Sequence, residues 1–212
     1  MPALHCLSQL VCLDLGWSKL GAAAATALAA PLRHLTALTE LELCGNEISA
    51  AGAASLAPAL RCHSRLARLD LTGNGVGAAG AEALAPALSC LSNLESLCLS
   101  ANDIGDGGAA ALAPSLALLT ALTRLHLDDN SLRDSGLLHL VPSLAFLTAL
   151  DCLQFTFEDV CSSRANAFSV KGLRKLRDGV PDVVWAAIDY DYPCFLAQAS
   201  DSGSDSGSDA GG

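Results

Sequence analysis

The chain has 212 residues, of which 51% are hydrophobic but only 4% aromatic, and its formal net charge is −10. This length allows one or two domains with a buried core, built here mainly from leucine and alanine. The acidic balance argues against nucleic acid and anionic membranes as partners and favours a basic protein partner.

The chain opens with PALHCLSQL at residues 2–10, and close copies follow at residues 58–66 and 86–94. Those copies lie at the end of a repeating unit, so residues 1–9 are predicted to be the tail of a truncated N-terminal repeat. A terminal repeat without a polar cap exposes core leucines. Two explanations stay open: the chain is part of a longer protein, or a partner or a frayed segment covers this end.

From residue 10 onward, the sequence repeats every 28 residues. Position 1 of each unit is a leucine: Leu10, Leu38, Leu66, Leu94, Leu122 and Leu150. Apolar residues at positions 4 and 6 have the two-residue alternation of a strand, and positions 15, 19 and 23 fall on one helical face. Residues 10–160 are therefore predicted to form an α/β solenoid of about six repeats, with a curved parallel sheet on one side and helices outside.

Three positions of the unit carry structural predictions. Position 15 is glycine in four repeats, which is predicted to let the start of the helix lie close to the strand. Prolines at position 21 or 22 predict helices that are kinked or split. Position 9 is asparagine in four repeats, and an asparagine amide can bridge backbone groups left unpaired where the chain leaves the strand. These asparagines are Asn46, Asn74, Asn102 and Asn130.

The pattern weakens after residue 150, and Glu158 occupies position 9 of the sixth unit. Residues 164–178 are predicted to form a helix with Phe168, Leu173 and Leu176 facing inward, and residues 182–191 a last strand. Residues 161–199 are predicted to be a C-terminal capping segment, in which Trp185 belongs to the core of the cap or to a docking patch. Residues 200–212 cannot bury apolar area and are predicted to be a disordered acidic Ser/Asp/Gly tail.

The pattern LxxLxLxxNxLxxxGxxxLxxxL over about residues 10–149 resembles the leucine-rich repeat family, and specifically its ribonuclease-inhibitor-like subclass. The resemblance implies a horseshoe with strands on the concave face. It also implies intracellular protein binding, as in ribonuclease inhibitor, the sensor regions of nucleotide-binding innate immune receptors, and the Ran GTPase activators. The fold follows more specifically from this resemblance than the function does.

We recognise no catalytic constellation in the sequence. The histidines form no HxH or HxxxH pair, and the glycines of residues 73–80 are explained by the repeat, so no metal or nucleotide site is predicted. Cys6, Cys62 and Cys90 share position 25 and are predicted to be small apolar filler. We therefore predict no enzyme activity, no cofactor and no small-molecule substrate. Nine cysteines without a CxxC pair, and no signal peptide, favour free thiols in the cytoplasm.

The concave face is the predicted interaction surface, because an array of one charge sign focuses the field that steers a partner. The alternative is a face that is only solvated. Trp17 is of a residue type enriched in binding hot spots, although packing on an upstream repeat would also explain it. The predicted partner-binding residues are Asp14, Trp17, Glu40, Glu42, Asp70, Glu95, Arg124, His126 and Asp128.

The chain is thus predicted to be a non-enzymatic module that binds a protein. One alternative is a GTPase activator resembling the Ran activator, which also follows its repeats with an acidic tail. Another is the sensor region of a nucleotide-binding innate immune receptor. A free-standing ribonuclease inhibitor fits the acidic face, but the arc is too short to wrap an enzyme.

Overall fold

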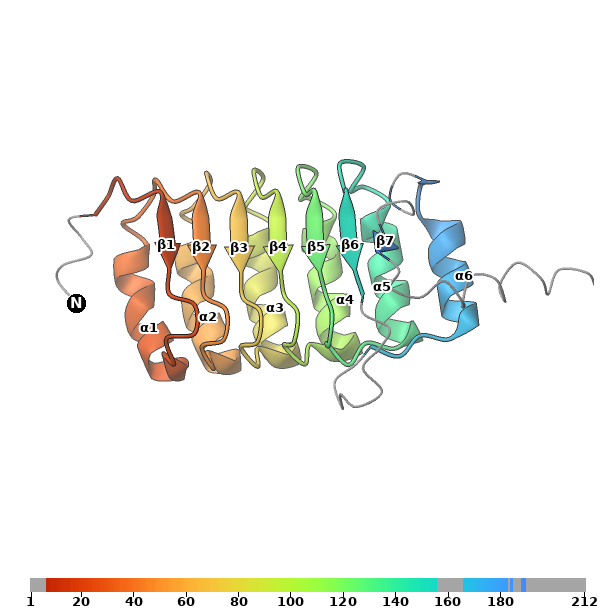
Figure 1. Cartoon of the computed structure of the whole chain (residues 1–212), viewed down its shortest axis with the longest axis horizontal. Helices are drawn as coiled ribbons and strands as arrows, with labels where there is room; N and C mark the ends of the chain where they lie inside the picture. Colours follow the sequence, from red (N-terminus) through yellow and green to blue (C-terminus); the bar gives the residue numbers. More distant parts are fainter. Residues whose placement is uncertain (1–6, 156–165, 183, 185–187, 190–212) are drawn as a thin grey trace, which may run out of the picture.

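In the computed structural model, the chain is a stack of strand–helix units, and the structure describes residues 7–155, 166–182, 184 and 188–189. Figure 1 shows the strands side by side in one layer and the helices in a second layer behind them. The strands form one parallel sheet in chain order. The predicted α/β solenoid, with a parallel sheet on one side and helices on the other, is confirmed.

The strands are short, and each is followed by a helix of 10 to 12 residues, except for the last. The strands are β1 (Cys12–Asp14), β2 (Glu40–Glu42), β3 (Arg68–Asp70), β4 (Ser96–Cys98), β5 (Arg124–His126), β6 (Cys152–Gln154) and β7 (Ile188–Asp189). The helices are α1 (Gly21–Leu32), α2 (Ser49–Leu60), α3 (Gly77–Leu88), α4 (Gly105–Leu116), α5 (Asp134–Leu144) and α6 (Val170–Gly179).

The pairing of the strands follows the sequence repeat. Leu69 of β3 lies opposite Leu97 of β4, which is 28 residues further along the chain, and the other pairs from β1 to β6 keep the same spacing. The last pair differs, because Leu153 of β6 lies opposite Ile188 of β7. The sixth unit is therefore longer than the others.

Leucines at positions 4 and 6 form the core between the two layers. In the middle of the stack they are fully enclosed: Leu69 and Leu97 are 0% exposed. In the first repeat, Leu13 and Leu15 are only partly buried against the same core. The difference arises because no strand or helix of the described residues covers the outer side of β1 and α1.

The helices run continuously through their prolines, so the predicted split is wrong. α2 contains Pro58 and ends two residues later at Leu60, and α1 ends one residue after Pro31. The turn that follows α2 is closed by a bond from the His63 N–H to the Leu60 carbonyl at 3.0 Å. Proline this close to the end of a helix removes few bonds, and it marks where the helix stops.

The glycines at position 15 lie against the preceding helix rather than against the strand. A Cβ added to Gly80 would lie 3.1 Å from the Ala50 Cα in α2. A Cβ added to Gly108 would lie 3.1 Å from the Ala78 Cα in α3. The prediction of a close approach was correct, but its partner was wrong: glycine lets neighbouring helices approach backbone to backbone.

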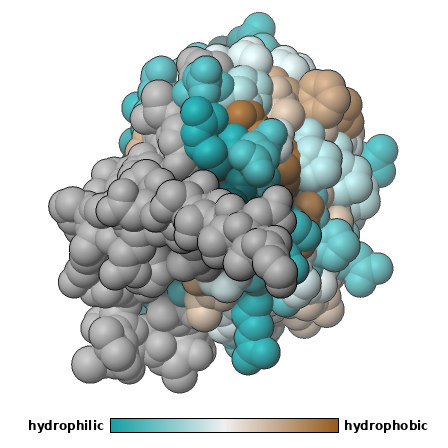
Figure 2. Space-filling view, turned by 90° about the vertical axis from the view of Figure 1, so that its right-hand side faces the viewer, coloured by the Kyte–Doolittle hydropathy of each residue, from teal (hydrophilic) through white to brown (hydrophobic). Residues whose placement is uncertain are grey.

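The sixth unit continues both layers. Helix α6 begins at Val170, later than the predicted residue 164, with Leu176 buried and Leu173 partly buried. The rings of Phe155 and Phe168 meet edge to face with their centroids 5.8 Å apart. β7 falls within the last strand predicted at residues 182–191, but Asp182 and Val184 at the start of that range are helical, so this part of the prediction is wrong. Figure 2 views this end, where hydrophilic and neutral residues make up most of the described surface and the hydrophobic areas between them are small.

Several predictions concern residues outside the described part. They are those on Cys6, Glu158, Trp185 and the tail at 200–212, together with most of residues 1–9. The division into domains therefore stays a prediction. Within the described ranges, no helix has both the length and the apolar character that crossing a membrane requires.

Candidate functional site

The face of the sheet that points away from the helices carries most of the predicted binding residues. In each strand the central leucine points to the helices, and the residues before and after it point the opposite way. We call positions 3 and 5 of β1 to β6 the open sheet face. Position 3 is Cys12, Glu40, Arg68, Ser96, Arg124 and Cys152, and position 5 is Asp14, Glu42, Asp70, Cys98, His126 and Gln154.

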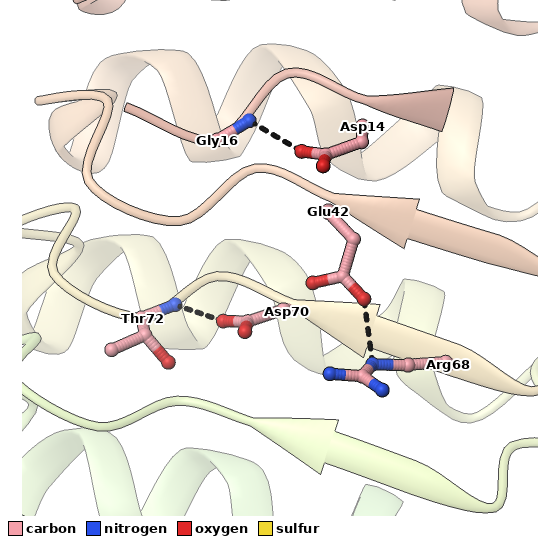
Figure 3. Close-up of polar contacts among 6 residues, drawn as sticks. All are labelled: Asp14, Gly16, Glu42, Arg68, Asp70 and Thr72. Atoms are coloured by element: carbon pink, nitrogen blue, oxygen red, sulfur yellow. Dashed lines mark hydrogen bonds and ion pairs between the residues drawn. The ribbon is translucent and has the colours of Figure 1, made fainter. Parts of the chain in front are cut away.

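Three carboxylates form a row across the first three strands, and we call Asp14, Glu42 and Asp70 the acidic row. Parallel pairing puts Asp14 opposite Glu42 and Glu42 opposite Asp70. Figure 3 shows that Asp14 Oδ1 accepts a hydrogen bond from the Gly16 N–H (2.9 Å) and Asp70 Oδ1 accepts one from the Thr72 N–H (2.8 Å). One oxygen of each aspartate thus stabilises the turn that follows its strand.

Arg68 from β3 reaches the middle of the acidic row. Its Nε lies 2.6 Å from Glu42 Oε1, also visible in Figure 3. Burial raises the pKa of Glu42, the charge of Arg68 lowers it, and the neighbouring Asp70 and Asp14 raise it, so that the pKa lies above its ordinary value. Because the Arg68 side chain is 47% exposed, the ion pair contributes little to stability. It does reduce the negative charge that an incoming partner would meet.

The predicted residues of β5 lie apart from the acidic row. Arg124 and His126 occupy positions 3 and 5 of β5, and Asp128 follows the strand. Asp128 Oδ2 accepts a hydrogen bond from Ser100 Oγ at 3.0 Å. The uncharged strand β4, with Cys98 at position 5, separates this group from Asp70. The predicted site is therefore two groups: an acidic one on β1 to β3 and one of mixed charge on β5.

Two further predicted residues, Glu40 and Glu95, lie near the beginnings of their strands. Glu40 is exposed at position 3 of β2. Glu95 directly precedes β4, and its side chain is exposed. Its carbonyl accepts hydrogen bonds from the Thr123 N–H (2.8 Å) and the Arg124 N–H (3.0 Å). Glu95 thus joins adjacent repeats through its backbone and leaves its carboxylate at the surface.

Trp17 lies beyond the end of β1 and is 78% exposed. Its backbone N–H donates to the Cys44 carbonyl at 2.7 Å. Its ring covers Gly45, where an added Cβ would lie 2.6 Å from the ring atom Cδ2. Sequence analysis left two roles open for Trp17: a binding residue, or a side chain packed on an upstream repeat. The ring contacts Gly45 of the second repeat, so this contact is not packing on an upstream repeat. The indole lies on the second repeat, with most of its surface free to meet a partner.

The position-9 asparagines connect each repeat to the one before it. Asn46 Nδ2 donates to the Leu15 carbonyl of the preceding repeat at 2.7 Å and to the Leu43 carbonyl of its own repeat at 3.0 Å. Asn46 Oδ1 accepts from the Ser18 N–H at 3.0 Å. Asn74, Asn102 and Asn130 repeat this arrangement. Since these groups are buried, each unmet partner would cost about 1–3 kcal/mol.

Asn166 extends this ladder, and sequence analysis missed it. Its Oδ1 accepts from the Asn130 N–H at 3.1 Å, and its Nδ2 donates to the Leu127 carbonyl at 2.8 Å. Asn166 lies 36 residues after Asn130 rather than 28, which hid it from the fixed period. One sequence pattern could have found it. In every repeat that has the asparagine, an apolar residue follows two positions later, and Asn166 and Phe168 have the same spacing.

The comparison with protein families agrees with this geometry. A family model described as Leucine Rich repeat matches residues 34–57, 66–85 and 90–113. These three stretches are thus similar to leucine-rich repeats. No curated protein matches the sequence. Leucine-rich repeats generally mediate binding between proteins, and the open sheet face is an extended surface on which they could do so.

Two thiols of the sheet layer, Cys44 and Cys98, are not activated. Burial and, to a smaller extent, the negative charge of Asp70 together raise the pKa of Cys98 to about 11. Burial and the same aspartate also raise the pKa of Cys44. Such thiols stay protonated near neutral pH and are poor nucleophiles. Cys62 and Cys90 are exposed at position 25, so their prediction as apolar filler was wrong. Among the described side chains, no three His, Cys, Asp or Glu residues are grouped to hold a metal ion.

Proposed function

We propose that this chain is a non-enzymatic interaction module of ribonuclease-inhibitor-like leucine-rich repeats, which binds a basic protein in the cytoplasm through its open sheet face. The observation that carries the proposal is the acidic row. Three neighbouring strands present carboxylates in register, next to an aromatic side chain that is 78% exposed. Soluble proteins use such surfaces to steer a partner of opposite charge.

The residues around the acidic row fit a partner that carries lysine or arginine. Asp14 and Asp70 each use one carboxylate oxygen for their own turn, as shown in Figure 3. Glu40 adds a fourth carboxylate to the same face, and its side chain is exposed, whereas those of Glu42 and Asp70 are partly buried. The exposed face of the Trp17 ring can receive a cation, an interaction worth about 0.5–1 kcal/mol at an exposed site. The more distant residues Glu95, Arg124, His126 and Asp128 would form the outer part of the same surface.

We propose the same domain division as the sequence predicted, with repeats at residues 10–160, a capping segment at 161–199 and a tail at 200–212. Two observations support this division. Asn166 continues the asparagine ladder, and α6 continues the helical layer with charged side chains on its exposed face. The compartment rests on the free cysteines, which a reducing cytoplasm would keep reduced.

The decisive experiment reverses charge on the acidic row. The variant Glu42→Lys/Asp70→Lys should slow association with a basic protein captured by the wild type about tenfold at low salt, with a smaller effect at high salt. The matched control is Glu82→Lys/Asp178→Lys, which makes the same charge change on exposed residues of α3 and α6. Surface plasmon resonance gives both rate constants. If the two double variants associate at equal rates, the open sheet face is not the binding surface.

A further inference from the structure

Among the described residues, backbone N–H groups on the outer edge of β1 have no partners. In later repeats, the N–H groups at positions 2 and 3 bind the preceding repeat: those of Ala67 and Arg68 donate to the Thr39 carbonyl at 2.8 and 2.9 Å. The equivalent N–H groups in the first repeat belong to Val11 and Cys12. No acceptor for them exists among the described residues.

The same edge also carries a backbone carbonyl for which the described residues supply no donor. The Asp70 carbonyl accepts from the Leu43 N–H at 2.9 Å, and this bond joins β3 to the repeat before it. Its equivalent in the first repeat is the Asp14 carbonyl, for which the described part of the chain supplies no donor. The free groups of β1 therefore have the order and spacing of one side of a parallel ladder.

Apolar side chains accompany these free groups. Val11 is 54% exposed, and Leu13 and Leu15 are partly open to solvent, whereas Leu41 and Leu43 at the same positions of the second repeat are 0% exposed. An unpaired strand edge beside exposed apolar side chains is a template for pairing with another chain. An occupant would satisfy the backbone and cover the leucines together.

The first repeat lacks the side chain that holds a preceding leucine-rich repeat. Position 9 is Ser18 in place of asparagine, and its Oγ donates to the Gly16 carbonyl of its own turn at 3.3 Å. Asn46, in contrast, reaches back to the Leu15 carbonyl and accepts from the backbone of the first repeat. Serine has no amide that could serve two partners in this way.

The first helix also lacks the glycine that admits a preceding helix. Position 15 of the first repeat is Ala24, where the second has Gly52. A Cβ on Gly52 would lie 3.1 Å from the Ala25 Cβ and 3.4 Å from the Ala22 Cα of α1. At the usual spacing, the Ala24 methyl group would crowd a helix placed before α1. An extended strand makes no demand on either Ser18 or Ala24.

We propose that the free edge of β1 binds an extended segment of a partner protein, which adds to the sheet as a parallel strand. The segment carries apolar residues at two alternate positions, where they cover Leu13 and Leu15, and a lysine or arginine between them. Alternation puts this basic residue on the open sheet face beside Asp14. Main-chain hydrogen bonds supply the affinity, and the alternate side chains supply the specificity.

This occupant differs from the preceding repeat that residues 1–9 predict. Both would pair with β1, but a repeat would bring a helix against Ala24 and would need a counterpart of the asparagine ladder at Ser18. A strand from another protein needs only the free groups of Val11, Cys12 and Asp14. The open sheet face can bind a basic partner whether or not this edge is occupied.

The probe is a fluorescein-labelled eight-residue peptide with leucine at two alternate positions and lysine between them. Its matched control has the same sequence, with N-methyl groups on the amides that face β1. Fluorescence anisotropy with the full chain should show binding of the first peptide and at least tenfold weaker binding of the second. Replacing the lysine by glutamate should weaken binding by a smaller factor, because that residue lies beside Asp14.

Val11→Pro removes one edge donor and should weaken the peptide at least tenfold. Its control is Thr36→Pro, because Thr36 is exposed and follows Leu35 in a turn closed by the Leu38 N–H, where proline is tolerated. In case Val11→Pro unfolds, hydrogen exchange on the unchanged protein provides a second measurement. The Val11 and Cys12 amides should exchange rapidly alone and at least tenfold more slowly with peptide.

Three results would overturn the proposal. Equal binding of the two peptides would exclude backbone pairing. Amides of Val11 and Cys12 that stay fast with bound peptide would move the binding site away from β1. Amides that are already protected in the protein alone would show that the chain, or a second copy of it, occupies the edge.

Discussion

The two ends of the stack are made from the same repeat and finish in different ways. At the C-terminal end, Asn166 accepts from the Leu132 N–H at 2.9 Å and completes the ladder, and the Leu153 side chain in β6 is 0% exposed. At the N-terminal end, Leu13 is partly exposed and Ser18 replaces the asparagine. Among the described residues, the C-terminal side is closed by a neighbour with polar groups in the right places, and the N-terminal side has no such neighbour.

The helices show the same contrast. Asp106 of α4 accepts from the Arg133 N–H at 2.8 Å and bonds to Ser135, and Asp134 of α5 binds Ser169 in the same way before α6. Burial raises the pKa of Asp106, but the hydrogen bonds from Ser135 and from backbone N–H groups lower it more. In helices α1 to α5 the side chain of the preceding residue makes no capping hydrogen bond, whereas the Ser169 side chain caps α6. Polar side chains from the preceding helix, added to leucine burial, thus secure the C-terminal half.

The largest expected difference between the ends concerns the position-4 leucines. Leu153→Ala should lower the free energy of unfolding by about 2–5 kcal/mol, as does truncation of other fully buried leucines. Leu13→Ala should cost less than about half as much, because Leu13 is already partly exposed. Urea unfolding measures both, with Leu97→Ala as the reference from the middle of the sheet. Equal losses at Leu13 and Leu153 would mean that the N-terminal end is covered.

The ladder provides the next comparison. Asn166→Ala should cost about 1–3 kcal/mol, because the buried N–H of Asn130 and carbonyl of Leu127 lose their partners. Ser18→Ala should cost less than about 0.5 kcal/mol, since the Ser18 hydroxyl bonds only its own turn. Thermal unfolding of the two variants side by side tests this. A Ser18 effect as large as that of Asn166 would contradict the one-sided ladder.

Acidification should loosen the N-terminal half selectively. His63 is 0% exposed between the Ala59 and Leu32 carbonyls, where other repeats have leucine, and burial lowers its pKa. The unfolded chain then binds a proton more readily, so stability is complete above pH 6.5 and falls as the pH drops below it. His63→Leu should remove this part of the pH dependence.

Urea unfolding at pH 8 and pH 5 measures that change. The titratable groups that follow the C-terminal ends of α1, α2 and α3, next to His63, are all exposed. They are Arg33, His34, Arg61, Cys62 and Cys90. They therefore remain hydrated in both states. Stability curves of wild type and His63→Leu that run parallel down to pH 5 would exclude His63 as the source.

The smallest effect is expected on the acidic row. Glu42→Gln removes the ion pair with Arg68, but it also removes the repulsion from Asp70 and Asp14 that helps raise the Glu42 pKa. These losses and gains should offset, leaving a change below about 0.5 kcal/mol at pH 7. The pKa of Glu42 is higher in the folded state than in the unfolded state, so ionisation of its carboxylate lowers the stability of the wild type as the pH rises from the unfolded pKa through the folded pKa. Above that range, the small difference in stability should favour the Glu42→Gln variant. A loss above 1 kcal/mol would make Arg68 and Glu42 structural.

Periodicity predicted most of the fold, because every strand contact between β1 and β6 repeats one local spacing. It failed where spacing changes or where the partner is remote in the chain. Asn166 lies beyond an insertion that shifts the period, and Gly80 contacts Ala50, a pairing that depends on how helices stack. At the candidate site, the outward side of each strand followed from alternation. The bond between Arg68 and Glu42 did not, since it depends on side-chain conformation.

The asparagine ladder has a direction, and that gives the molecule a preferred order of unravelling. Each asparagine holds the loop of its own repeat and that of the repeat before it, as Asn46 does through the Leu43 and Leu15 carbonyls. If the first repeat peels away, the new terminal loop keeps its own asparagine. If the last one peels away, the loop left behind loses an acceptor for its N–H groups. Pulled from both termini, the stack should therefore unzip from its N-terminus.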